Sequence, residues 1–218
     1  MPAIAIPFEL DISKPWQTVT GIDYDNDLIA LAKKIGDIRK TRSGDSISQI
    51  SPKSTNEARP NTFGARFGMG RYPFHTDTAH LTIPVRYLVM KVEGVTDRPT
   101  NLAKVSDIVE RLSSDELRLF KESVWYSGSS GSRFTCSLML KYKGNGCFRY
   151  DPVCMKPANH AALECRTILS KIDQEIDFYE HEWRPNEALV ISNWQCMHGR
   201  GVSGSDFEDR TLKRIYVD

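Results

Sequence analysis

The stretch 71–80, "RYPFHTDTAH", places a histidine and an aspartate two residues apart in a run that otherwise suits a β-strand. Side chains alternate along a strand, so His75 and Asp77 would point to the same face. The two groups could bind a metal ion together, or they could form a polar pair at the edge of a sheet. The pair alone does not separate these interpretations, because a chain with five histidines and 28 acidic residues contains a chance His-x-acid sequence about half of the time.

The stretch 185–218, "PNEALVISNWQCMHGRGVSGSDFEDRTLKRIYVD", favours the metal. An apolar strand leads to His198, and a glycine-containing loop then leads to Arg210 and another strand. Two imidazoles and one carboxylate on a rigid sheet form a facial triad, which is typical of non-haem Fe(II). The planar fork of Arg210 could bind a carboxylate. This combination suits a 2-oxo acid, whose keto oxygen and C1 carboxylate chelate iron while its distal carboxylate needs a cation.

Composition limits the other possibilities. The 218 residues, 40% of them apolar and 26% charged, are typical of one soluble globular domain. A net charge of +1 gives no electrostatic basis for binding nucleic acid or an anionic membrane surface. The chain has no apolar stretch of transmembrane length, and the start "MPAIAIPFEL" does not resemble a signal peptide. Five cysteines without a CxxC pair favour a reducing, cytoplasmic location.

The periodicity of apolar residues predicts more strands than helices, without regular βα alternation. Helices are expected over 26–38, over 106–125 in two pieces with a capping box at Ser113 and Glu116, and over 158–177. Strands are expected over 81–92, 134–142, 147–150, 187–192 and 211–217, with a hairpin turn at Asn145-Gly146. The pattern predicts a mainly β domain with flanking helices, in which loops 41–64 and 127–133 could cover the site.

The segments "FHTD", "NWQCMHGRG" and "DRTLKRIYV" together resemble the Fe(II)/2-oxoglutarate-dependent oxygenases of the taurine dioxygenase and clavaminate synthase group. The resemblance covers residues 64–218. It implies metal ligation by His75, Asp77 and His198. It also implies that Arg210 and Thr100 hold the 2-oxoglutarate C5 carboxylate. Arg214 matches a position that in some relatives contacts an acidic group of the substrate.

The same resemblance implies a double-stranded β-helix, a distorted jelly roll of the cupin type. It implies an enzyme that uses Fe(II), 2-oxoglutarate and O2 to hydroxylate a C–H bond, while desaturation or cyclisation would use the same residues. The presence of Asp77 favours hydroxylation over halogenation. The expected substrate is a small polar, amino-acid-like metabolite of secondary metabolism, either free or presented by a carrier protein.

Two other classes of function stay open from the sequence. A zinc-dependent hydrolase could use the same three ligands with an activated water, but it would give Arg210 no required role. A non-catalytic binding module could retain the barrel as a scaffold, but it would have no reason to retain the ligands together with Arg210.

Overall fold

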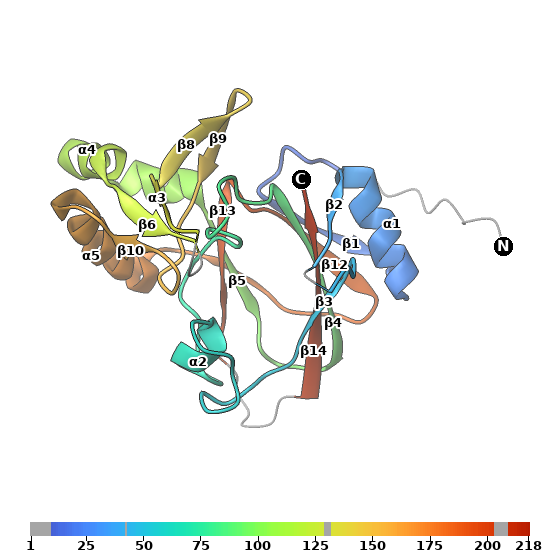
Figure 1. Ribbon diagram of the computed structural model, residues 1–218. Coiled ribbons are helices and arrows are strands. Elements are labelled where there is room, and N and C mark those ends of the chain that lie inside the picture. The colour runs from blue at the N-terminus through green and yellow to red at the C-terminus, as the bar shows by residue number, and fades with distance from the viewer. Residues whose placement is uncertain (1–9, 42, 129–131, 203–208) are drawn as a thin grey trace.

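Two antiparallel sheets that face each other form the centre of the protein in a computed structural model, which describes residues 10–41, 43–128, 132–202 and 209–218 (Figure 1). The larger sheet has the strand order β1-β12-β4-β14-β2, and β3 pairs with β14. Its strands are β1 (Trp16–Thr20), β2 (Ile38–Arg39), β3 (Ser48–Ile50), β4 (Tyr87–Val95), β12 (Glu187–Ser192) and β14 (Asp209–Val217). The smaller sheet has the order β11-β5-β13, with β11 (Tyr179–His181), β5 (Thr100–Lys104) and β13 (Cys196–Arg200).

Within the described ranges, five helices and two smaller strand groups surround these sheets. The helices are α1 (Asp25–Ile35), α2 (Phe63–Phe67), α3 (Val105–Arg111), α4 (Ser114–Glu122) and α5 (His160–Glu175). One strand group is β10-β6-β7, with β6 (Trp125–Ser127), β7 (Phe134–Cys136) and β10 (Lys156–Pro157), and the other is the hairpin of β8 (Met139–Tyr142) and β9 (Asn145–Phe148). Among the described residues, none of the helices has the length and apolar character needed to cross a membrane.

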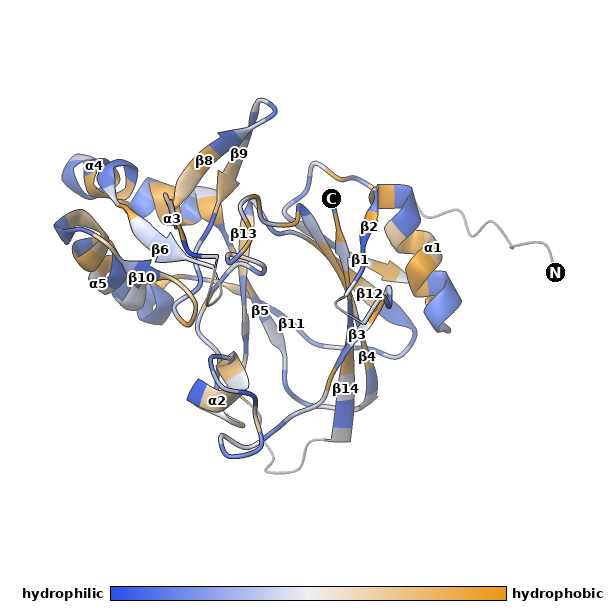
Figure 2. Cartoon of the chain, in the orientation of Figure 1, coloured by the Kyte–Doolittle hydropathy of each residue, from blue (hydrophilic) through white to orange (hydrophobic). Residues whose placement is uncertain are grey.

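Strand alternation divides the larger sheet into two apolar faces. Leu88 and Met90 of β4 point inward, where they pack with Leu102 of the smaller sheet. Tyr87 and Val89 of the same strand point outward and pack against α1. Figure 2 shows that α1 carries both apolar and polar stretches, as expected for a helix with one face on a sheet. The space between the two sheets is therefore lined by the inner faces of both, and the site lies there.

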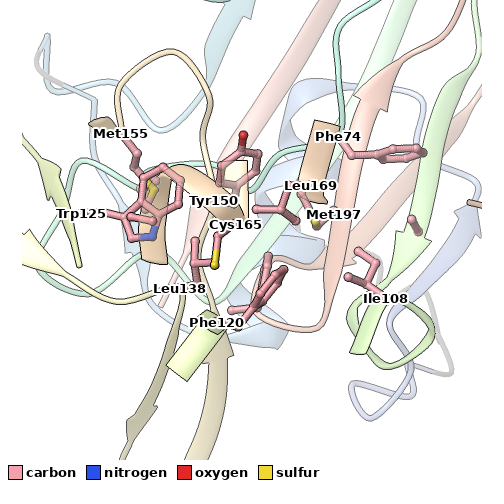
Figure 3. Close-up of a cluster of buried hydrophobic side chains, with 14 of the residues drawn as sticks. Phe74, Ile108, Phe120, Trp125, Leu138, Tyr150, Met155, Cys165, Leu169 and Met197 are labelled. Carbon is pink, nitrogen blue, oxygen red and sulfur yellow. The ribbon is translucent and has the colours of Figure 1, made fainter. Parts of the chain in front are cut away.

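Helices α3, α4 and α5 cover the outer face of the smaller sheet. Ala103 of β5 and Met197 of β13 pack in one cluster with Phe120, Leu169 and other helix residues (Figure 3). The predicted capping box is present, because the Ser113 hydroxyl accepts a hydrogen bond from Glu116 N (3.3 Å) and the Glu116 carboxylate accepts one from Ser113 N (2.8 Å). These helices hold β13, which carries His198, from behind.

The predicted position of the hairpin turn is wrong. The hairpin turn is at Lys143-Gly144, both with positive φ, and Asn145 already pairs with Tyr142. This register places the buried Phe148 opposite Met139, whereas a turn at Asn145-Gly146 would place it opposite Lys143.

The strand predicted over 81–92 begins only at Tyr87. Preceding backbone groups are bonded to side chains instead, since the Asn193 amide donates to Val85 O (2.9 Å) and the Thr78 hydroxyl accepts from Val85 N (2.9 Å). The segment before β4 is therefore a set of turns fixed by Asn193 and Thr78.

Candidate metal centre

The structure brings His75, Asp77 and His198 together between the two sheets. One ligand atom from each lies within 4.8 Å of the others. His75 Nε2 is 3.9 Å from Asp77 Oδ1, and His198 Nε2 is 3.9 Å from Asp77 Oδ2. All three residues are less than one-tenth exposed. The donor set of two imidazoles and one carboxylate fits a divalent metal of the iron or zinc type.

Backbone pairing sets the distance between the two histidines. His75 and His198 form an isolated antiparallel bridge, in which each N–H donates to the other residue's carbonyl at 2.9 Å. Gly199 makes this approach possible, because a Cβ there would lie 2.7 Å from Tyr72 O. The glycine after His198 is therefore required by backbone packing.

Asp77 is held by a turn, so the strand suggested for 71–80 is wrong beyond His75. The next residue, Thr78, has a φ of 57°. The buried Asn193 accepts a hydrogen bond from Asp77 N (2.8 Å) and donates one to Asp77 O (3.0 Å). The Asn193 side-chain amide, rather than pairing with a neighbouring strand, therefore fixes the Asp77 backbone and orients the Asp77 carboxylate toward the histidines.

Both imidazoles can offer an unprotonated nitrogen to a metal ion. Pro73 O lies 2.9 Å from His75 Nδ1, and a proton on Nδ1 would leave Nε2 unprotonated for a metal. The Phe63 ring of α2 stacks on His75 at a centroid distance of 4.1 Å, which restrains the imidazole. Burial, together with the neighbouring His75, lowers the pKa of His198 to about 3, so this imidazole is neutral at physiological pH.

Arg214 lies against the same centre. Its Nη1 donates to Asp77 Oδ2 at 2.7 Å, and its guanidinium lies 4.6 Å from the Tyr216 ring centroid. Although burial opposes ionisation, the Arg214 guanidinium holds the pKa of Asp77 below its ordinary value. The carboxylate is thus charged and oriented without a metal.

Arg210 and Thr100 face the same interior from opposite sheets. Arg210 shares the inner face of β14 with Leu212 and Arg214, because alternate residues point the same way, and it is 8% exposed. Thr100 is two residues from Leu102, which pairs directly with His198. The Thr100 hydroxyl accepts a hydrogen bond from Trp183 Nε1 at 3.2 Å.

Sequence patterns did not identify several residues that support the centre. The Asp173 carboxylate of α5 accepts bidentate hydrogen bonds from Arg71, at 2.5 Å from Nη1 and 3.1 Å from Nη2. It also accepts a hydrogen bond from Phe74 N (2.7 Å). It thereby ties the residue before His75 to the helix layer. Such a contact spans about a hundred residues of chain and has no local sequence signal.

The two loops expected to cover the site differ in what the structure shows. The 41–64 segment ends in α2, and its residue Phe63 contacts His75 directly. In the 127–133 loop, residues 129–131 lie outside the described part of the chain.

Comparisons with known proteins identify the fold. No family model matches the sequence, and no curated protein matches it. An asparagine oxygenase solved with Fe(II), 3-hydroxyasparagine and succinate is similar over 93% of this chain and 74% of its own, with a TM-score of 0.76 and 16% identity. OrfP, solved with iron and α-ketoglutaric acid, has a TM-score of 0.70 and 18% identity over 94% of this chain and 74% of its own.

PvcB from Pseudomonas aeruginosa, described as an iron and α-ketoglutarate-dependent oxygenase from an isonitrile synthetic pathway, has a TM-score of 0.69 and 17% identity. That similarity covers 94% of this chain and 76% of PvcB. The protein therefore has the mainly β, antiparallel fold of the non-haem iron oxygenases that use 2-oxoglutarate.

Proposed function

We propose that the protein is an Fe(II)/2-oxoglutarate-dependent oxygenase. The observation that carries this proposal is the convergence of His75, Asp77 and His198 between the two facing sheets of this fold. A His-Asp-His triad leaves metal positions open for a chelating cosubstrate and for O2. The two facing sheets would form a double-stranded β-helix within a single domain covering residues 1–218.

The residues around the triad take roles that follow from their charge and placement. Arg210, a buried cation on the inner face of β14, binds the C5 carboxylate of 2-oxoglutarate. Thr100 approaches from the opposite sheet. Its oxygen already accepts a hydrogen bond from Trp183 Nε1, so its own O–H is available to donate to the same carboxylate. Arg214 keeps Asp77 charged and oriented, and it would also contact an acidic group of the substrate.

When bound, Fe(II) and 2-oxoglutarate would supply, with O2 as the oxidant, a decarboxylation that releases succinate and carbon dioxide and oxidises a C–H bond of the substrate. The chain positions these groups and excludes water from the centre, with segments 41–64 and 127–133 as the covering loops. The structures of asparagine oxygenase and OrfP contain hydroxylated amino acids. An amino-acid-like substrate, free or carrier-bound, in cytoplasmic secondary metabolism is therefore the proposed class.

The test is an anaerobic visible spectrum of the protein titrated first with Fe(II) and then with 2-oxoglutarate. Wild type should show a metal-to-ligand charge-transfer band, and Asp77→Ala and Arg210→Ala should weaken it. Arg118→Ala, which alters an exposed arginine of α4, should leave the band unchanged. Iron binding without a band would favour the hydrolase, and a chain that binds no iron would favour the binding module.

A further inference from the structure

Arg149 is a buried cation that no carboxylate of the described residues neutralises. It is 1% exposed. Nη2 donates to Thr82 O at 2.6 Å, but Nε and Nη1, which carry three of the five N–H groups, have no hydrogen-bond acceptor among the described residues. The Phe134 ring lies 5.6 Å from the guanidinium carbon, and the thiols of Cys136 and Cys147 are also neighbours.

No described carboxylate forms an ion pair with Arg149, whereas three other cations of the protein have one. Arg71 pairs with Asp173 and Lys213 with Asp25, and Arg214 pairs with a metal-ligand carboxylate.

Two thiols beside the guanidinium do not supply the negative charge. Burial raises the pKa of Cys136, and it raises the pKa of Cys147 to about 12, in both cases against the opposing effect of Arg149. Both thiols are therefore neutral at physiological pH. Because an arginine cannot lose its proton in a protein, burial of an unpaired guanidinium is costly unless an anion meets it.

The position of Arg149 relates it to the metal centre. The next residue, Tyr150, forms two hydrogen bonds with Thr76. Thr76 N donates to Tyr150 O at 2.7 Å, and Tyr150 N donates to the Thr76 hydroxyl oxygen at 3.0 Å. Thr76 is the residue between His75 and Asp77. The Tyr150 ring enters the helix-side core (Figure 3). Arg149, which follows β9 in the chain, donates to Thr82 O in the segment that follows Asp77.

We propose that Arg149 binds a carboxylate of the substrate. This inference rests on the proposed function, which assigns the two carboxylates of 2-oxoglutarate to the metal and to Arg210. A carboxylate bound by Arg149 would therefore belong to the substrate. The surroundings of Arg149 are an aromatic ring, neutral thiols and one carbonyl, which suit a flat, singly charged carboxylate better than a phosphate that needs more donors.

The test is thermal unfolding in sodium acetate and in sodium chloride at equal ionic strength, for wild type, Arg149→Met, Arg149→Lys and Arg210→Met. Wild type should melt a few degrees higher in acetate, because a ligand that binds the folded state raises its stability. Arg149→Met should lose this response and melt in chloride no lower than wild type, since replacing an unpaired buried charge by an apolar side chain is neutral or stabilising. Arg149→Lys should respond weakly, and Arg210→Met should keep an acetate response.

Each contrary result overturns the inference. An acetate response absent from wild type or retained in Arg149→Met removes the site, and a response lost only in Arg210→Met assigns acetate to the cosubstrate position. A large loss of stability in Arg149→Met in chloride would mean that the arginine serves only to hold Thr82. A stronger response to inorganic phosphate than to acetate overturns the carboxylate class.

The charge-transfer spectrum separates this inference from the proposed function. If the band is absent from wild type while the Arg149-dependent acetate response is present, the oxygenase assignment fails and the anion site stands. If the band is present in both wild type and Arg149→Met but the acetate response does not depend on Arg149, the oxygenase stands and the inference fails.

Discussion

Replacing Asp173 by alanine tests whether the helix layer supports the metal centre. The carboxylate of Asp173 holds the Arg71 guanidinium and the Phe74 N–H, one residue before His75. Leaving a partly buried N–H without an acceptor costs about 1–3 kcal/mol. The ion pair, with side chains 31% and 15% exposed, adds about 1 kcal/mol after allowance for solvent screening. The expected loss of stability is therefore about 2–4 kcal/mol.

A second effect should appear in metal binding. Because Asp173 fixes the segment that carries His75, its loss should weaken metal affinity by roughly 10–100-fold, as is usual when a group that orients a metal ligand is removed. Urea unfolding followed by tryptophan fluorescence gives the first quantity, and calorimetric titration with Co(II) gives the second. Asp173→Asn keeps an oxygen for Phe74 N–H and should lose only about half as much stability.

Asp177→Ala is the matched control, because it breaks an Arg–Asp pair with Arg111 that is also short, at 2.7 Å, but exposed. It should change neither stability nor metal affinity measurably. If Asp173→Ala were as mild as Asp177→Ala in both assays, the support attributed to α5 would be wrong.

Three smaller perturbations test contacts around the metal centre. Arg214→Met should destabilise the metal-free protein by about 3 kcal/mol in urea unfolding, because it leaves the Asp77 carboxylate buried without its cation; a loss below about 1 kcal/mol would contradict this. The metal-free protein should lose stability as the pH falls below about 6.5, by up to about 1.4 kcal/mol per pH unit, because the unfolded chain takes up a proton that the buried His198 does not. His198→Gln should flatten that slope. Trp183→Phe removes one hydrogen bond to Thr100 and should cost about 1 kcal/mol in the same assay.

The helices and the buried strands were predictable because their signals are local. The capping box at Ser113 begins α4 where the sequence places it, and the strand predicted over 187–192 matches β12. The predicted helix over 158–177 is two residues too long at each end. Apolar periodicity identifies elements well, since it reflects which face is buried.

Features set by distant contacts could not be predicted in this way. The turn at Lys143-Gly144 depends on which residue faces Phe148 across the hairpin, and the segment around Asp77 depends on Asn193, more than a hundred residues away. The sequence resemblance grouped His75, Asp77 and His198 correctly as neighbours in space. It did not indicate the contact of Arg214 with Asp77, or the unneutralised charge of Arg149, because both depend on packing between separate strands.

Gly199 has a consequence for how related chains would diverge. Its missing side chain lets one backbone lie against another, a requirement of architecture that persists whether or not a metal is bound. A descendant that lost the metal site could exchange His75 or Asp77 freely while retaining this glycine. Within such a lineage, the glycine would indicate a retained scaffold, and the histidine–aspartate pair would indicate a retained metal site.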